Sequence, residues 1–263
     1  MNFKRETILL GDKKYKILRG GNPLLGSVLF LHGWNSKSER YEHPFSFLPE
    51  NFSQIIIPDL PGFGESQKPE NVWGVDEYAE WAMEIIKAIG VEKIIIAGHS
   101  FGGQIAIRVA SENNPKVIGA LLYASARVQK HSSVKKAVFY GVAKLGNIVF
   151  SIPVLSRFSL FVKKILYRAV GSSDYLNAKE MREIMVKVTG QDMKKNILKI
   201  SVPVSIIWGA KDASTPVSDA FYLKKNISNS NLKIIGGAGH KFHITDPEKF
   251  AREFSEQITW ILR

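Results

Sequence analysis

The fold is decided by the stretch Ile94-Ile95-Ile96-Ala97-Gly98-His99-Ser100-Phe101-Gly102-Gly103. Its first part is a short run of β-branched apolar residues, which is typical of a buried parallel strand. The run ends in a Gly-x-Ser-x-Gly motif, and apolar residues then recur at helical spacing as far as Ala110. A strand, this motif and a helix in that order predict a nucleophile elbow, a sharp turn that carries a reactive serine.

The two glycines of the motif, Gly98 and Gly102, are expected to make room for this turn. Neither adds a Cβ where backbone segments approach each other closely, and the serine between them takes a strained backbone conformation. The helix that follows points its first amides at Ser100, where negative charge develops during attack on a carbonyl group. The alternative is a glycine-rich turn without chemistry, because this motif on its own recurs by chance.

The composition indicates a globular protein with a sizeable core. The 263 residues are 45% hydrophobic and 23% charged. Because the chain holds no cysteine, a cysteine nucleophile, thiolate metal ligands and disulfides are excluded. The N-terminal residues contain too short an apolar run for a signal peptide, so we expect a cytoplasmic protein. The sequence suggests neither a cofactor nor a metal ion.

Apolar strands alternate with helical segments over most of the chain. Besides the elbow strand, the expected strands cover residues 7–10, 15–19, 28–31, 55–57, 117–124, 204–208 and 232–235. Most are apolar throughout, which predicts a mostly parallel α/β sheet with helices on both faces. One helix is expected over residues 76–89, with Gly90 as its stop. Another should begin at Thr215-Pro216, with the Thr215 hydroxyl as cap. The last should run from Asp246-Pro247-Glu248 to about Ile261, and Thr245-x-x-Glu248 fits a capping box for it.

The alternation breaks between Ala126 and Ile200, where the sequence holds no convincing buried strand. Helices are expected instead over residues 133–149, 155–170 and 177–188, with a short fourth helix over residues 191–198. We therefore predict an α/β core of residues 1–125 and 201–263, interrupted late in the chain by an all-helical cap, or lid, of residues 126–200.

Two residues later in the chain provide what a reactive serine requires. A serine hydroxyl needs a base, and the base needs an acid to orient it. Asp212 follows the strand that ends at Trp208, and His240 follows the strand that ends at Ile235. Since the carboxyl ends of parallel strands meet at one edge of a sheet, we expect Ser100, Asp212 and His240 to converge there. The alternatives are a helix-capping role for Asp212 and a plain loop position for His240.

The segment His32-Gly33-Trp34 follows the strand at residues 28–31 and suggests where an oxyanion would bind. Acyl transfer needs two backbone N–H groups aimed at the developing oxyanion, and we expect them from Phe101 and Trp34. The alternative is a simple glycine turn at the end of the strand. His32 is interpreted as structural, and His99 as packing beneath the loop. The remaining histidines, interpreted as surface or packing residues, are His43, His131 and His243.

These motifs, in this order, resemble those of the α/β-hydrolase superfamily, in the group with a helical cap after the sixth core strand. The resemblance covers nearly the whole chain. It rests on His32-Gly33-Trp34, Asp59-Leu60-Pro61-Gly62-Phe63-Gly64, Gly98-His99-Ser100-Phe101-Gly102-Gly103, Gly209-x-x-Asp212-x-x-x-Pro216 and Gly237-x-Gly239-His240. It implies an eight-stranded sheet, Ser100, Asp212 and His240 as a catalytic triad, and a structural loop at residues 59–64.

Two positions refine this resemblance. A serine at position 100 argues against the dehalogenases and epoxide hydrolases of the superfamily, which use an aspartate there. The residues after His240 depart from the pattern of many relatives, because Lys241 puts a cation near the mouth of the site. The resemblance therefore implies a serine hydrolase and leaves its substrate open.

Most of the positive charge lies in the predicted cap. Residues 126–200 hold 15 lysines and arginines against 4 acidic residues, about +11 of the net +12. A basic amphipathic cap could associate weakly with an anionic membrane surface, but the preferred interpretation is an apolar roof over the active site with lysines facing water. Interruptions at Lys144, Pro153 and Arg157 exclude a transmembrane span. No nucleic-acid motif accompanies the charge, so nucleic acid is not expected as a partner.

The sequence thus favours a serine hydrolase, specifically a carboxylesterase that acts on small or medium acyl esters through an acyl-enzyme. The expected partner is a small-molecule ester substrate. A carbon–carbon hydrolase that cleaves a diketone is the first alternative, since some capped relatives catalyse that reaction. A non-catalytic binding or membrane-surface protein is the second, and the complete set of serine, histidine and aspartate argues against it.

Overall fold

A computed structural model of the chain describes residues 1–129 and 179–263. The chain forms two compact units, one of residues Met1–Gln129 and Lys187–Arg263 and the other of residues Lys130–Val186. The helices expected over residues 133–149 and 155–170 lie outside the described residues. Of the second unit, the structure describes only the end, with the short 3₁₀ helix η2 (Lys179–Met181) and the start of α7 (Arg182–Gly190).

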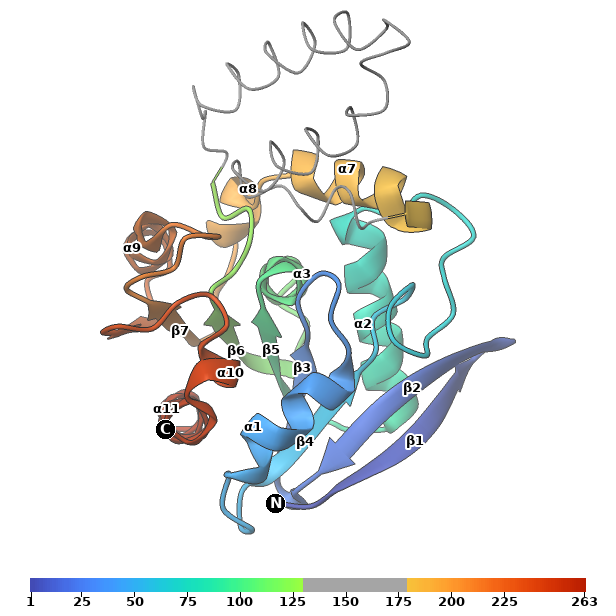
Figure 1. Cartoon of the computed structure of the whole chain (residues 1–263), viewed down its shortest axis with the longest axis horizontal. Coiled ribbons are helices and arrows are strands. Elements are labelled where there is room, and N and C mark those ends of the chain that lie inside the picture. The colour runs from blue at the N-terminus through green and yellow to red at the C-terminus, as the bar shows by residue number, and fades with distance from the viewer. Residues whose placement is uncertain (130–178) are drawn as a thin grey trace, which may run out of the picture. The chain divides into compact units, whose positions relative to one another are not determined.

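The first unit is built on an eight-stranded sheet with the order β1-β2-β4-β3-β5-β6-β7-β8 (Figure 1). The strands are β1 (Phe3–Leu10), β2 (Lys13–Gly20), β3 (Asn22–Leu31), β4 (Ser53–Pro58), β5 (Ile94–His99), β6 (Val117–Tyr123), β7 (Val204–Gly209) and β8 (Ser230–Ile235). β2 pairs antiparallel with β1 and β4, and the five pairs from β4–β3 to β7–β8 are parallel. The mostly parallel sheet predicted from the sequence is therefore confirmed.

Helices cover both faces of this sheet (Figure 1). They are η1 (Ser38–Tyr41), α1 (Glu42–Ser46), α2 (Val75–Ile89), α3 (Phe101–Ala110), α8 (Lys194–Ile197), α9 (Val217–Asn226), α10 (Phe242–Thr245) and α11 (Pro247–Ile261). α2 packs against α3, and α1 packs against α11. Because the central strands are covered on both sides, Ile94 and Ile96 of β5 and residues 28–31 of β3 are 0% exposed.

One helix start differs from the capping box predicted at Thr245 and Glu248. Pro247 is the first residue of α11, which makes Asp246 the cap, and the Asp246 carboxylate accepts from the backbone N–H of Lys249 at 3.3 Å. Thr245 belongs to the end of α10 instead. The predicted capping box was wrong because Pro247 favours the first position of a helix, which makes Asp246 the N-cap in place of Thr245.

The predicted cap of α9 is also wrong, whereas the predicted end of α2 is confirmed. α2 stops before Gly90, which adopts the left-handed region with a φ of 77°. At α9, Pro216 occupies the cap position and no side chain caps the helix. The hydroxyl of Thr215 donates instead to Oδ2 of Asp212 at 2.8 Å.

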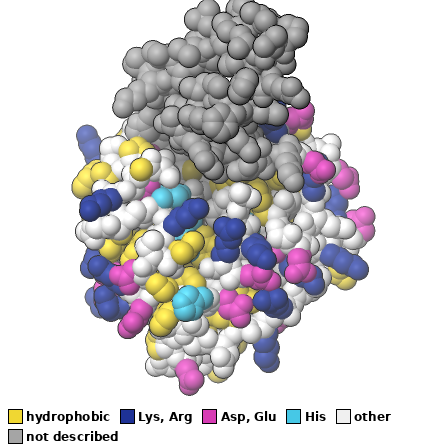
Figure 2. Space-filling view, viewed as in Figure 1, with side chains coloured by type: hydrophobic (Ala, Val, Ile, Leu, Met, Phe, Trp, Pro, Cys, Tyr) yellow, Lys and Arg dark blue, Asp and Glu magenta, His cyan; other side chains and the backbone are white. Residues whose placement is uncertain are grey.

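Charges of both signs are interspersed on the described surface that is visible in Figure 2. Oppositely charged side chains of the described residues also pair, as in Arg5 with Glu39 at 2.9 Å and Lys187 with Glu77 at 2.7 Å. Within residues 1–129 and 179–263, no helix is long and apolar enough to cross a membrane.

Candidate active site

Ser100 stands at the turn between β5 and α3 in a strained backbone conformation. Its φ of 54° and ψ of −111° lie in a region that residues with a side chain rarely adopt. Three backbone bonds hold it there: its N–H donates to Tyr123 O at 3.0 Å, and its carbonyl accepts from Gln104 N at 3.1 Å and Ala126 N at 2.9 Å. The end of β6 and the first turn of α3 therefore hold the serine at the tip of the turn, where it is half-buried.

The two predicted elbow glycines lie where a side chain has no space. A Cβ on Gly98 would lie 2.2 Å from the carbonyl oxygen of Gly102, and a Cβ on Gly102 would lie 2.0 Å from the carbonyl oxygen of Leu31. The second contact shows how closely α3 approaches the end of β3. Gly33 lies near as well, because a Cβ there would be 3.4 Å from Cβ of Ser100.

The backbone N–H groups of Trp34 and Phe101 are available for an oxyanion, since neither donates to any of the described residues. Phe101 is the first residue of α3, so its N–H has no partner within the helix. The ring of Trp34 packs against the rings of Phe63 and Phe101 at centroid distances of 4.9 and 5.4 Å. These contacts hold the two predicted donor residues beside each other, next to the serine.

His32 has the structural role that the sequence suggested. Its ring is buried, Nδ1 donates to the carbonyl of Gly33 at 2.8 Å, and Nε2 accepts from the N–H of Leu60 at 3.0 Å. Burial lowers the pKa of His32 to about 4, so the ring stays neutral at physiological pH. It thereby ties the Trp34 loop to the loop at residues 59–64. In that second loop, the Asp59 carboxylate accepts from the N–H of Ser38 at 2.6 Å.

Asp212 and His240 are brought together by the loops after β7 and β8. His240 Nδ1 donates to Oδ2 of Asp212 at 2.8 Å, and the side chains are 16% and 0% exposed respectively. Oδ2 also accepts from the hydroxyl of Thr215 at 2.8 Å, while Oδ1 accepts from the N–H groups of Ser214 and Thr215 at 2.8 and 2.9 Å. Burial by itself raises the pKa of Asp212, but the hydrogen bonds from His240 and Thr215 outweigh burial and hold the pKa below its ordinary value.

The imidazole of His240 lies against the elbow. Its ring centroid is 4.7 Å from that of His99, the residue directly before Ser100. Since Nδ1 is bonded to Asp212, Nε2 is the nitrogen left to act as a base. The hydroxyl of Ser100 makes no hydrogen bond to any residue that the structure describes. The structure thus pairs Asp212 with His240 and brings the His240 ring next to the elbow.

Several residues that the sequence did not single out support this arrangement. Tyr41 bonds to Nδ1 of the buried His99 at 2.9 Å, and Tyr123 bonds to Nδ1 of the buried His243 at 3.1 Å. His243, expected only to pack, stacks on the ring of Tyr41 at 4.7 Å. Tyr123 ends β6 at the carboxyl edge of the sheet, and this position was the one signal in the sequence. Trp208, at 0% exposure, donates its indole N–H to Thr215 O at 3.0 Å and so anchors the acid loop.

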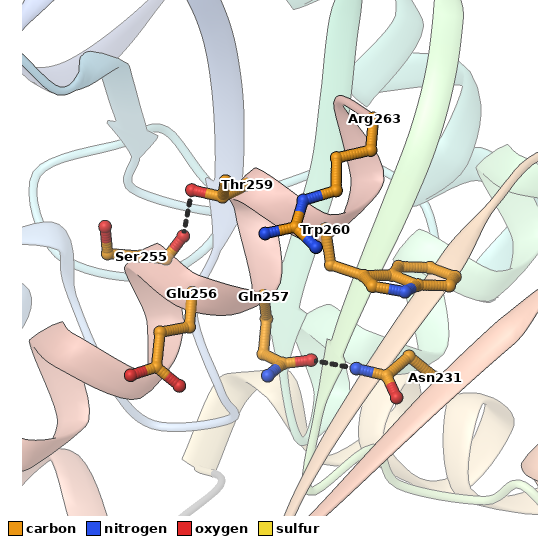
Figure 3. A pocket seen from close by; sticks show the side chains of 7 residues that line it. All are labelled: Asn231, Ser255, Glu256, Gln257, Thr259, Trp260 and Arg263. Atoms are coloured by element: carbon orange, nitrogen blue, oxygen red, sulfur yellow. Dashed lines mark hydrogen bonds between the residues drawn. The ribbon is translucent and has the colours of Figure 1, made fainter.

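The described residues suggest no other centre of chemistry. Over residues 1–129 and 179–263, no group of three or more His, Asp and Glu side chains could hold a metal ion. A surface hollow of about 400 Å³ lies along α11 and the start of β8 (Figure 3). Its amide Gln257 already accepts from Asn231 at 2.7 Å and Ser205 at 2.5 Å, and none of the candidate site residues lines it.

Known proteins match the chain over most of its length. A family model described as serine aminopeptidase, S33, matches residues 22–248. The AB hydrolase superfamily protein YisY of Bacillus subtilis is 25% identical, over 84% of this chain and 87% of that protein. The monoacylglycerol lipase ABHD6 of Bos taurus is also 25% identical, over 86% and 73% respectively. The crystal structure of a bacterial membrane phospholipase A superimposes with a TM-score of 0.78 at 21% identity, covering 99% of this chain and 87% of that one.

Proposed function

The chain belongs to the serine aminopeptidase S33 family of α/β hydrolases, and we propose that it hydrolyses carboxylic esters through an acyl-enzyme on Ser100. The observation that carries this proposal is the buried Asp212–His240 hydrogen bond of 2.8 Å beside the strained elbow. A buried carboxylate bonded to Nδ1 keeps the other ring nitrogen free to take a proton, which is the requirement for activating a serine hydroxyl.

Each residue then has one task. Ser100 Oγ attacks the ester carbonyl while Nε2 of His240 takes its proton, and the same nitrogen returns the proton to the leaving alcohol. Asp212 orients the ring and stabilises the imidazolium that forms. The N–H groups of Trp34 and Phe101 hold the oxyanion, and each such donor contributes about 2.7–4 kcal/mol in enzymes of this kind. Water then attacks the carbonyl carbon of the acyl-enzyme while Nε2 of His240 takes its proton. The same nitrogen returns the proton to Ser100 Oγ as the carboxylic acid leaves.

An ester of a small or medium apolar acyl group is the substrate class we propose. The ring of Trp34 packs against the rings of Phe63 and Phe101, and this aromatic cluster at the two proposed donor residues favours an apolar acyl chain over a charged one. The monoacylglycerol lipase among the relatives supports cleavage of an ester bond. We also propose that residues 126–200 act as a helical cap, or lid, over this site.

The test is release of p-nitrophenol from p-nitrophenyl esters of increasing acyl length, together with covalent labelling by a fluorophosphonate. Ser100→Ala should abolish both. Ser111→Ala is the matched control, because its hydroxyl lies at the other end of α3, where it donates to Arg108 O at 2.7 Å and accepts from the side-chain amide of Asn196 at 3.0 Å. Undiminished hydrolysis by Ser100→Ala would overturn the proposal.

Two further assays address the alternatives. The first compares kcat/KM for a vinylogous diketone of the ring-fission type with kcat/KM for the esters. A larger value for the diketone would favour carbon–carbon cleavage, and a larger value for an ester would favour ester hydrolysis. Flotation with anionic liposomes at physiological salt tests weak membrane association of the basic cap, which we rank below a purely small-molecule partner. The proposed function needs neither a nucleic acid nor a cofactor. We propose the cytoplasm as the location of the protein.

A further inference from the structure

The main-chain carbonyl of His240 is held by two donors from elsewhere on the sheet edge. Tyr123 donates its hydroxyl proton to this oxygen at 3.1 Å, and Nε2 of His99 lies 3.0 Å from it. A carbonyl oxygen only accepts, so Nε2 of His99 carries a proton and donates it. His240 is thus restrained twice, on its ring by Asp212 and on its backbone by Tyr123 and His99.

The proton positions in the surrounding network follow from these two bonds. With its proton on Nε2, neutral His99 accepts on Nδ1, which takes the hydroxyl proton of Tyr41 at 2.9 Å. Tyr123, whose single proton goes to His240, accepts from Nδ1–H and the backbone N–H of His243 at 3.1 and 3.3 Å. Two chains of hydrogen bonds then end at the carbonyl oxygen of His240, one from Tyr41 through His99 and one from His243 through Tyr123. In such chains each bond polarises the next.

The cluster is shielded from water, so solvent does not compete for these bonds. Tyr41, Tyr123, His99 and His243 are 1%, 0%, 4% and 3% exposed. Burial lowers the pKa of His99 well below its ordinary value and that of His243 to about 3. Both rings are therefore neutral at physiological pH, as the donor and acceptor assignment requires.

The loop that carries His240 is tied to its surroundings at Ala238, whose N–H donates to Ile235 O at 3.3 Å and whose carbonyl accepts from Lys211 N at 2.8 Å, while its glycines have open space around them. A Cβ added at Gly236 or Gly237 would meet nothing within 4 Å, and one at Gly239 would meet only the carbonyl oxygen of Lys211, at 3.8 Å. Catalytic groups need to be held to within about 0.5 Å of their working geometry. The bonds at Ala238 hold the loop two residues before His240, so the bonds to the carbonyl of His240 add restraint at the base itself.

The residues that supply it also hold the nucleophile. His99 directly precedes Ser100 in the chain, and the carbonyl of Tyr123 accepts a hydrogen bond from the N–H of Ser100 at 3.0 Å. We propose that His99 and Tyr123 are positioning residues, which together set the distance between the hydroxyl of Ser100 and the imidazole of His240. This inference rests on the proposed function, and it adds two residues that bond to the backbone carbonyl of His240 and not to its reacting nitrogen.

The test uses Tyr123→Phe, which deletes one hydroxyl, and a pair of variants at position 99. His99→Leu removes the donor to His240, whereas the side-chain amide of His99→Gln can donate from a similar position. We expect Tyr123→Phe and His99→Leu to lower kcat about tenfold per titrated active site with KM within about twofold, as the loss of one hydrogen bond implies. His99→Gln should restore most of the loss, and Ser53→Ala, which deletes a buried hydroxyl-to-carbonyl bond of 2.8 Å at the far end of β4, should change neither value.

A second readout does not depend on substrate. The short bond to Asp212 should give the Nδ1–H of His240 a downfield proton resonance, assigned by its loss in Asp212→Asn. We expect this resonance to broaden or disappear in Tyr123→Phe and His99→Leu and to persist in His99→Gln and Ser53→Ala. An unchanged resonance in the first two variants, or equal activity losses in His99→Leu and His99→Gln, would overturn the inference. An inactive wild-type protein with the expected resonance pattern would instead overturn the ester hydrolase proposal alone.

Discussion

Replacing Thr215 with valine should weaken the proposed triad without changing its charges. Valine keeps the shape of threonine and removes the hydroxyl that donates to Oδ2 of Asp212 at 2.8 Å, the oxygen that also accepts from His240. A hydrogen bond to a charged group contributes about 1.5–3 kcal/mol. A loss of that size in the transition state lowers kcat roughly 10- to 100-fold.

The rest of the acid loop should remain in place in this variant. Oδ1 of Asp212 keeps the N–H groups of Ser214 and Thr215, at 2.8 and 2.9 Å, and Trp208 still donates to the carbonyl of Thr215. The effect should therefore fall on kcat more than on KM or on the melting temperature. The assay is p-nitrophenyl ester hydrolysis, with turnover expressed per site titrated by a fluorophosphonate.

Thr215→Ser provides the matched control, because serine keeps the hydroxyl and loses only a methyl group. It should retain turnover within about threefold of the wild type, since a hydrogen bond of this kind survives small adjustments. If Thr215→Val and Thr215→Ser turned over ester at the same rate per site, the hydroxyl would have no part in orienting Asp212.

Two other expectations concern stability. Burial lowers the pKa of His32 to about 4, whereas a histidine in the unfolded chain takes up a proton near pH 6.5. The contribution of His32 to the free energy of unfolding is therefore fully present above pH 6.5. It should decrease by about 3 kcal/mol as the pH drops from 7 to 4. Urea unfolding at pH 7 and pH 4 measures it, and equal values would contradict it. Gly102→Ala should cost about 3 kcal/mol or more, because its Cβ would lie 2.0 Å from Leu31 O, whereas Gly190→Ala, with nothing within 4 Å, should cost almost nothing. Similar melting temperatures for the two variants would refute this assignment.

The sheet and the candidate residues on it could be predicted because both depend on the ends of strands. A buried parallel strand is visible as an apolar run, and the residue after it necessarily lies at the carboxyl edge. Ser100, Asp212 and His240 each follow such a run, after β5, β7 and β8. Their order along the chain then limits the arrangements at that edge to very few.

The residues that support the base could not be found in this way. Tyr41 lies in η1, 58 positions before His99, and its hydroxyl reaches Nδ1 of that histidine at 2.9 Å while its ring packs against Phe30 of β3 at 4.8 Å. Nothing in the local sequence distinguishes such a tyrosine from one that merely fills the core. Its hydrogen-bond partner depends on the position of a 3₁₀ turn to within a fraction of an ångström, whereas periodicity encodes only which side of an element is buried.

Asp212 shows why a residue can satisfy two competing interpretations at once. As a turn residue it accepts two backbone N–H groups on Oδ1, and as the partner of a base it accepts from His240 on Oδ2. A carboxylate offers about four lone-pair sites, and the four donors described here occupy them, with the Thr215 hydroxyl as the fourth. The bonds to the turn therefore do not compete with the bond to the base. They hold the carboxylate in the orientation that the base requires, so a local turn signal at a strand end is compatible with catalysis and strengthens the case for it.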